Sequence, residues 1–132
     1  GIALNCAGDA LVIGSDTLLY RLVFNLVENA IRYSRTGSTV NVSICDNDSH
    51  VFLRVEDQGP GIPKQYRESI FQPFFRLDKS RSRAYGGAGL GLALVWEIAA
   101  LHGGTVEVEE SSENGTTILV SLPKRSAALT EQ

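Results

Sequence analysis

Apolar residues recur at helical spacing over residues 17–33 and again over 90–101. Steps of three and four residues place such side chains on one face of a helix, so the sequence predicts two amphipathic helices with one buried side each. The run that begins at His102 and contains two glycines ends the second helix. A shorter helix is predicted over 63–70, with Pro63 in its first turn.

Apolar and polar residues alternate elsewhere, which is the pattern of strands with one buried face. Residues 39–57 contain two such runs around a polar turn and predict a β-hairpin, and residues 106–122 predict a second one. A further short strand is predicted over 10–14. The expected fold is a two-layer α/β sandwich: a mixed, mostly antiparallel sheet of about five strands, covered on one face by about three helices.

The chain has 132 residues, 43% of them hydrophobic and 20% charged, which is the balance of one ordinary globular domain. We expect this domain to cover 1–123, followed by a disordered tail over 124–132. The chain begins with glycine and contains no methionine, so it is expected to be a piece of a longer protein.

Composition also excludes several functions. A formal net charge of -3 does not favour a nucleic-acid partner. No apolar run approaches the length of a membrane span, and the pattern of a signal peptide is not expected here. Cys6 and Cys45 are too few for a disulfide framework or a zinc site, and they favour a reducing compartment.

Polar chemistry appears first on the helix predicted over 17–33. Asn25, Asn29 and Arg32 recur at steps of four and three residues and therefore share one stripe. Two amide oxygens with a cation one turn further along suit a hydrated magnesium ion and its phosphates. Taken alone, however, the stripe is better explained as a solvated helix face.

A second candidate follows the strand that ends near Asp57. The strand delivers this carboxylate to the end of the sheet, and Gly59 and Gly61 allow a flat ligand to come close. Because a carboxylate only accepts hydrogen bonds, it could recognise the amino group of adenine. A glycine-rich turn in which the aspartate bonds its own backbone would show the same residues.

The third candidate is the glycine-rich run 86–92, which opens the last helix. Amide N–H groups at a helix N-terminus attract phosphate. The run is not a Rossmann fingerprint, because no strand precedes it directly, and it lacks the lysine of a P-loop. By itself it could equally be a flexible hinge.

Together and in this order, the motifs resemble the sequence boxes of sensor histidine kinases. The similarity extends from about residue 10 to Pro123. Five segments carry it: 25–33 resembles the N box, 57–63 the first glycine box, 70–76 the F box, 87–92 the second glycine box and 115–117 the last, short box.

The resemblance implies the ATP-binding catalytic domain of a two-component sensor kinase. Its Bergerat-type fold is shared with gyrase-type, Hsp90-type and mismatch-repair ATPases. The implied cofactors are ATP and Mg²⁺, with Asn29 and Asn25 as the catalytic residues that hold the metal. Arg32 and Tyr33 would approach the phosphates or ribose, and Asp57 would bind the adenine amino group.

The other residues that the resemblance implies at the nucleotide fall into three groups. They are Gly59, Gly61, Ile62, Thr116 and Thr117 around the base; Lys79, Arg81 and Arg83 in an ATP lid over 76–88; and Gly87, Ala88, Gly89, Leu90, Gly91 and Leu92 around the triphosphate. Phe71, Phe74 and Phe75 would anchor the lid, face a partner domain or pack in the core. Ala88 departs from the family, which often has serine or threonine there.

The predicted chemistry is phosphoryl transfer to another protein group. ATPases of this fold typically have glutamate at the position of Asn25, and an amide cannot accept a proton from water. Glu28 points away from Asn25 and is expected at the surface. His50 in a hairpin turn and His102 at a helix end lack an acceptor context, so both are expected to have surface or capping roles. The chain would therefore donate the γ-phosphate of Mg-ATP to a histidine on a separate domain.

The implied partners are the phosphoacceptor dimerisation domain of the same kinase and a response regulator, with a homodimeric parent. The domain would be cytoplasmic, and the parent anchored in the bacterial inner membrane. One alternative is an ATP-hydrolysing or anti-sigma serine kinase relative, which would carry a carboxylate in place of Asn25. Another is a docking module that binds no nucleotide, against which the intact Asn29, Asp57 and 87–91 argue.

Overall fold

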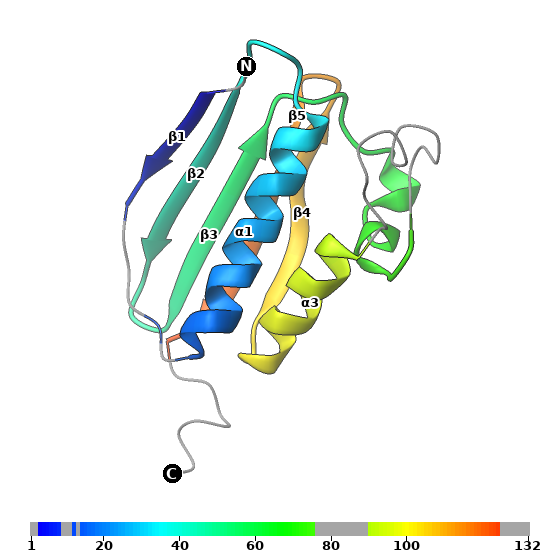
Figure 1. Ribbon diagram of the computed structural model, residues 1–132. Coiled ribbons are helices and arrows are strands. Elements are labelled where there is room, and N and C mark those ends of the chain that lie inside the picture. The colour runs from blue at the N-terminus through cyan, green and yellow to red at the C-terminus, as the bar shows by residue number, and fades with distance from the viewer. Residues whose placement is uncertain (1–2, 9–11, 13, 76–89, 125–132) are drawn as a thin grey trace.

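The computed structural model describes residues 3–8, 12, 14–75 and 90–124, which form two layers (Figure 1). One layer is a five-stranded sheet in the order β1-β2-β3-β5-β4. Its strands are β1 (Ala3–Ala7), β2 (Thr39–Asp46), β3 (His50–Asp57), β4 (Thr105–Ser112) and β5 (Gly115–Pro123). β1 pairs with β2 in parallel, and the other neighbours are antiparallel. The predicted mixed, mostly antiparallel sheet and both predicted hairpins are confirmed.

Helices make up the other layer, on one face of the sheet (Figure 1). The two α-helices are α1 (Asp16–Tyr33) and α3 (Gly91–Leu101), and the short 3₁₀-helices are η1 (Lys64–Tyr66) and η2 (Ser69–Phe71). The helix predicted over 63–70 is therefore two separate turns, in which Tyr66 N–H bonds the Pro63 carbonyl and Phe71 N–H bonds the Glu68 carbonyl. Bonds that span three residues are typical of short 3₁₀ segments. The predicted two-layer sandwich is confirmed.

The core lies between these layers and follows the predicted periodicities. On α1 the buried residues are Leu22, Leu26 and Ala30, spaced by four. On β3, Val51, Leu53 and Val55 are buried, and the residues between them are partly exposed. Side chains that meet at steps of four on the helix and two on the strand can close one continuous apolar layer.

The strand predicted over 10–14 is wrong where the structure describes it, because Val12 and Gly14 lie outside any strand. The remaining residues of that stretch lie outside the described ones. The first strand is instead β1, paired from Ala3↔Thr39 to Ala7↔Ser43 at the edge of the sheet. All five of its residues are exposed. An edge strand with no buried face has no alternation for a sequence pattern to detect.

β5, the last strand along the chain, ends beside the turn between β2 and β3. Pro123 lies opposite His50, and Lys124 donates its backbone N–H to the Ser49 carbonyl at 2.8 Å. The Lys124 ammonium also pairs with Asp46 at 2.7 Å. From residue 125 onwards the predicted tail lies outside the described residues.

His102 joins the end of α3 to the beginning of α1. The residue is 5% exposed, and its Nε2 accepts the Ser15 backbone N–H at 3.1 Å. Its Nδ1 lies 2.8 Å from the Ile98 carbonyl oxygen. Because Nε2 accepts, the ring proton is on Nδ1 and is donated to that carbonyl. A Cβ at Gly14 would lie 2.4 Å from the ring, so this position needs a glycine.

Replacing the ring should therefore destabilise the fold. We expect His102→Ala to lower the free energy of unfolding by about 2–4 kcal/mol, because it leaves a cavity and two unpaired backbone groups. His50→Ala is the matched control, since that ring is partly exposed and bonds the neighbouring Ser49 hydroxyl and stacks on Phe52 within the hairpin; its cost should be below about 1 kcal/mol. Urea denaturation measures both, and equal losses would contradict the structural role of His102.

Candidate functional site

Asp57 is a buried carboxylate at the end of β3, 8% exposed. Its Oδ1 accepts the backbone N–H groups of Gly59 at 2.9 Å and of Thr116 at 3.2 Å. No hydrogen bond between described residues ends on Oδ2. One oxygen therefore holds the fold together, and the other is left to accept a hydrogen bond from a bound group.

Burial raises the pKa of Asp57 above its ordinary value of 3.8. The hydrogen bonds from Gly59 and Thr116 lower this pKa, and the nearby carboxylate of Glu56 raises it, but burial has the largest effect. A carboxyl group with a raised pKa at the end of a strand is typical of a functional site.

The glycines around Asp57 are required by contacts between backbones. A Cβ at Gly59 would lie 2.5 Å from the Tyr33 carbonyl oxygen, and one at Gly61 would lie 2.1 Å from the Ser112 carbonyl oxygen. Gly61 also has a positive φ of 86°, which favours glycine. The structure thus gives a reason for these two glycines in addition to the close ligand approach predicted from the sequence.

Behind the glycine loop lies a hydroxyl network. The Thr116 side chain, 4% exposed, lies with its hydroxyl 2.8 Å from Ser111 Oγ, which in turn accepts the Ile62 N–H at 2.8 Å. The sequence analysis missed Ser111. β4 contains a register shift between Val108 and Glu110, after which Ser111 pairs with Thr116. Such a bulge moves the following residues to the opposite face of the strand, so simple alternation would place Ser111 outside the core.

The polar stripe of α1 lies beside this loop and continues toward α3. Asn25 donates its Nδ2 to the Arg21 carbonyl at 2.8 Å, which fixes the orientation of the amide. Its Oδ1 would be 3.4 Å from a Cβ at Gly91, so this oxygen faces the first residue of α3. Asn29, one turn further along α1, is half-buried, and no hydrogen bond to a described residue uses its side chain.

Arg32 and Glu28 form an ion pair on α1 at 3.3 Å. The Glu28 side chain is 48% exposed, which agrees with the surface position expected for it. The ion pair with Arg32 holds the Glu28 carboxylate away from the Asn25 oxygen. The Arg32 guanidinium lies in the same stripe as Asn25 and Asn29.

The N-terminus of α3 is a second candidate contact region. Leu90 is its N-cap residue, and no side chain caps the helix there. The first amide N–H groups of a helix have no partner within it, and they attract anions. Leu90, Gly91 and Leu92 lie at this end. The other predicted phosphate contacts, namely Lys79, Arg81, Arg83, Gly87, Ala88 and Gly89, lie outside the described residues, as does the predicted lid over 76–88.

The C-terminal end of α1 is fixed to the Asp57 loop. Arg35 donates to the carbonyls of Gln58 at 3.4 Å and Glu113 at 2.8 Å, and the Gln58 side chain accepts the Thr39 N–H at 2.8 Å. The loop at Gly59 therefore lies at one end of α1, and α3 begins near Asn25, about 12 Å away along the helix. This distance matches an elongated ligand with a flat group at one end and an anionic group at the other.

The aromatic residues of the segment 70–76 have different environments. Phe71 is in the core, and the Phe75 ring packs against Tyr66 with ring centroids 5.6 Å apart. Phe74 is 69% exposed and has a φ of 66°. Of the alternatives that the sequence left open, core packing therefore holds for Phe71 and for the partly buried Phe75, and of the three only Phe74 is exposed.

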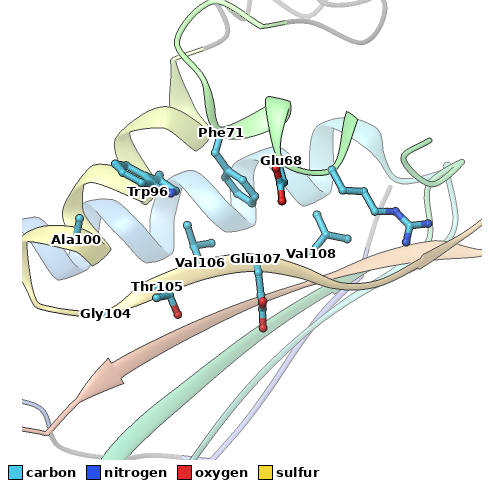
Figure 2. Close-up of a pocket in the computed structure, with 10 residues that line it drawn as sticks. Glu68, Phe71, Trp96, Ala100, Gly104, Thr105, Val106, Glu107 and Val108 are labelled. Carbon is cyan, nitrogen blue, oxygen red and sulfur yellow. The ribbon is translucent and has the colours of Figure 1, made fainter. Parts of the chain in front are cut away.

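A groove of about 650 Å³ lies elsewhere, between α3, η2 and β4 (Figure 2). Phe71, Trp96 and Val106 contribute apolar side chains to its lining, and none of the described residues predicted at the nucleotide lines it. Among the described residues, no three histidine, cysteine or acidic side chains gather around a common point. In the same part of the chain, no helix is both long and apolar enough to cross a bilayer.

Comparison with known proteins identifies relatives of this arrangement. Residues 14–126 match the profile of histidine kinase-, DNA gyrase B- and HSP90-like ATPases. The sensor-like histidine kinase SenX3 of Mycobacterium tuberculosis is 46% identical over 112 residues, which cover 85% of this chain and 27% of SenX3. The chain thus spans about a quarter of that relative.

Solved structures agree with the sequence comparison. The mycobacterial sensor histidine kinase MprB is 36% identical, with a TM-score of 0.81 over 95% of this chain and 83% of that one. Full-length ShkA in complex with AMPPNP is 27% identical, with a TM-score of 0.76 over 96% of this chain and 26% of that one. The resemblance to a histidine kinase catalytic domain and the predicted fold are confirmed.

The raised pKa of Asp57 predicts how stability depends on pH. The folded state binds this proton more tightly than the unfolded chain does, so the free energy of unfolding should fall as pH rises from below 3.8 through the raised pKa. Asp57→Asn removes that contribution while its Oδ1 still accepts both N–H groups. In urea denaturation from about pH 3 to pH 7, the variant should gain stability relative to wild type as pH rises. A difference in stability between variant and wild type that stays constant or shifts toward wild type as pH rises would contradict this.

Proposed function

This chain belongs to the family of histidine kinase-, DNA gyrase B- and HSP90-like ATPases, and we propose that it binds Mg-ATP and donates the γ-phosphate to a histidine. That histidine would lie on the dimerisation domain of the same two-component sensor kinase, whose product would pass to a response regulator. The observation that carries the proposal is the pairing of two features: a buried carboxylate at the C-terminal end of α1, whose Oδ2 accepts no hydrogen bond from a described residue, and the N-terminus of α3 beside Asn25 in the middle of α1.

The carboxylate end suits adenine. With Oδ1 occupied by two backbone N–H groups, Oδ2 of Asp57 is placed to accept a hydrogen bond from the amino group of the base. Guanine has a carbonyl at that position, and two acceptors facing each other would repel. Gly61 and Ile62 would form the wall beside the base, with Thr116 and Thr117 from the neighbouring strand.

The other end suits phosphates. The first amide N–H groups of α3 have no partner within the helix, and the amide oxygen of Asn25 faces its first residue. Magnesium prefers oxygen ligands and keeps much of its water, so the oxygens of Asn25 and Asn29 fit the ion as a pair of neutral ligands. Bound Mg²⁺ would offset charge on the phosphates during transfer. The relation to ShkA, solved with AMPPNP, supports a nucleotide at this site.

The residues of the site favour transfer to a protein group over hydrolysis. Asn25 cannot accept a proton from water, and Glu28 is engaged with Arg32. The rings of His50 and His102 are both engaged in hydrogen bonds within the fold. The acceptor imidazole must therefore come from another domain, where its nitrogen forms the new bond to phosphorus as the bond to the leaving ADP breaks.

A role within a longer sensor kinase follows from the same relatives. The chain corresponds to about a quarter of SenX3, so the acceptor domain and any sensor region would lie in the rest of the parent protein. We place this domain on the cytoplasmic side of a parent that is anchored in the inner membrane and forms a homodimer.

Adenine recognition predicts a selective loss of affinity in Asp57→Asn. Removing a charge-assisted hydrogen bond costs about 1.5–3 kcal/mol, so ATP affinity should fall at least about tenfold, and the preference for ATP over GTP should narrow. Glu56→Gln is the control, because Glu56 is the exposed carboxylate next to Asp57. The ATP affinity of this variant should stay within about twofold of that of the wild type. Unchanged ATP affinity in calorimetry of Asp57→Asn would remove this residue from the site.

Transfer and hydrolysis can be separated with radiolabelled ATP. The chain alone should bind nucleotide and release little phosphate, and with the parent's dimerisation domain it should label the acceptor histidine. Asn29→Ala should abolish labelling, whereas Arg21→Ala, on an exposed part of the same helix, should not.

Asn25→Glu introduces a carboxylate that can accept a proton next to the proposed phosphate position. In the same assay this variant should release more phosphate and label less histidine. Fast ATP hydrolysis by the wild-type chain alone would replace the transfer proposal with the hydrolase alternative, and absence of nucleotide binding would replace it with the docking module.

A further inference from the structure

Arg67 and Ser111 together hold the peptide groups of Ile62. Ser111 Oγ accepts the Ile62 N–H at 2.8 Å, and Arg67 Nε donates to the Ile62 carbonyl at 3.2 Å. Arg67 Nη2 also donates to the Ser111 carbonyl at 3.1 Å. The two side chains thus form a closed ring of hydrogen bonds, in which both polar groups of Ile62 are used.

This ring is connected to the Asp57 carboxylate by two routes. In the first, Ser111 Oγ lies 2.8 Å from the Thr116 hydroxyl, and the Thr116 backbone N–H donates to Asp57 Oδ1. In the second, the loop that ends at Ile62 contains Gly59, whose N–H donates to the same oxygen. Both donors that orient Asp57 therefore belong to segments that Ser111 contacts.

We propose that Arg67 and Ser111 are positioning residues that orient Oδ2 of Asp57 and thereby set the selectivity for adenine. The inference rests on the proposed function of the site. Neither side chain needs to touch the base: Arg67 binds the far side of the loop, where it lines the groove between η2 and β4.

The geometry explains why both residues are needed. Arg35 holds the loop at Gln58. Beyond that residue, Gly59 and Gly61 lie against α1 and β4 through close backbone contacts, which limit approach but do not prevent separation. Directional hydrogen bonds from Ser111 and Arg67 supply the missing restraint. The planar fork of arginine can reach two carbonyls at once, and the single ammonium of lysine does not reproduce that geometry.

Four single variants test the proposal by competition against a labelled ATP analogue. Ser111→Ala and Arg67→Met should each lower ATP affinity about three- to tenfold while changing GTP affinity less, so that the preference for ATP narrows. Ser112→Ala and Lys64→Met are matched controls. The Ser112 hydroxyl bonds only the Asn114 N–H of the turn, and Lys64 is exposed; both should leave the preference unchanged.

Coupling to Asp57 gives a readout that loss of stability would not produce. In the Asp57→Asn background, Ser111→Ala and Arg67→Met should cause little further loss of ATP affinity, because the group they orient is already gone. Full additivity would overturn the proposal, and so would equal losses for ATP and GTP. If Arg67→Met does not fold, Arg67→Lys and Ser111→Ala carry the same test.

Failure of this inference and failure of the proposed function have different signatures. If Asp57→Asn weakens ATP binding but Ser111→Ala and Arg67→Met behave like their controls, only the positioning role is wrong. If the wild-type chain shows no preference for ATP over GTP, the proposed function itself is wrong at its base-recognition step, whatever the variants do.

Discussion

Burial of the Asp57 carboxylate is the constraint on which the polar half of this molecule depends. Taking a charge out of water raises the pKa of the group, and the fold offsets this with two backbone N–H groups on a single oxygen. Gly115 must be a glycine so that β5 can approach, since a Cβ there would lie 2.0 Å from the Asp57 carbonyl oxygen. The bulge in β4 then brings Ser111 to the same side. Oδ2, which accepts no hydrogen bond from a described residue, is the atom that this arrangement leaves for a ligand.

The packing of α1 against α3 sets the distance between the two ends of the proposed site. α1 and α3 lie side by side on the sheet (Figure 1) and are joined at one end by His102. This contact places the N-terminus of α3 opposite the middle of α1, at Asn25. A structural histidine therefore contributes to the distance between the Asp57 loop and the N-terminus of α3, the two ends of the proposed nucleotide site. The domain uses rigid elements for both ends, which is an effective way to hold an elongated ligand.

The amide at residue 25, where a proton-accepting carboxylate could stand, limits the chemistry that the site can perform. An amide at residue 25 can orient a ligand or bind a cation, but it cannot deprotonate water. The nearest acidic residue on the helix, Glu28, is paired with Arg32. Under the proposed function, such a site would bind ATP without activating water and keep the γ-phosphate for an acceptor on another domain.

The amino-acid sequence by itself determined the family, the two-layer fold, the hairpins and both α-helices, because each depends on local periodicity or on motifs that are contiguous in the chain. It also predicted Asp57 as a site residue, because a place at the end of a strand is a local property. It could not locate β1, which has no buried face, or show that 63–70 forms two 3₁₀ turns. Only the tertiary structure revealed the hydrogen bonds of Ser111 and Arg67 to Ile62, which lies 49 and 5 residues away from them in the sequence. A bulge decides the face on which Ser111 lies, and hydrogen bonds to backbone carbonyls leave no signature in side-chain pattern.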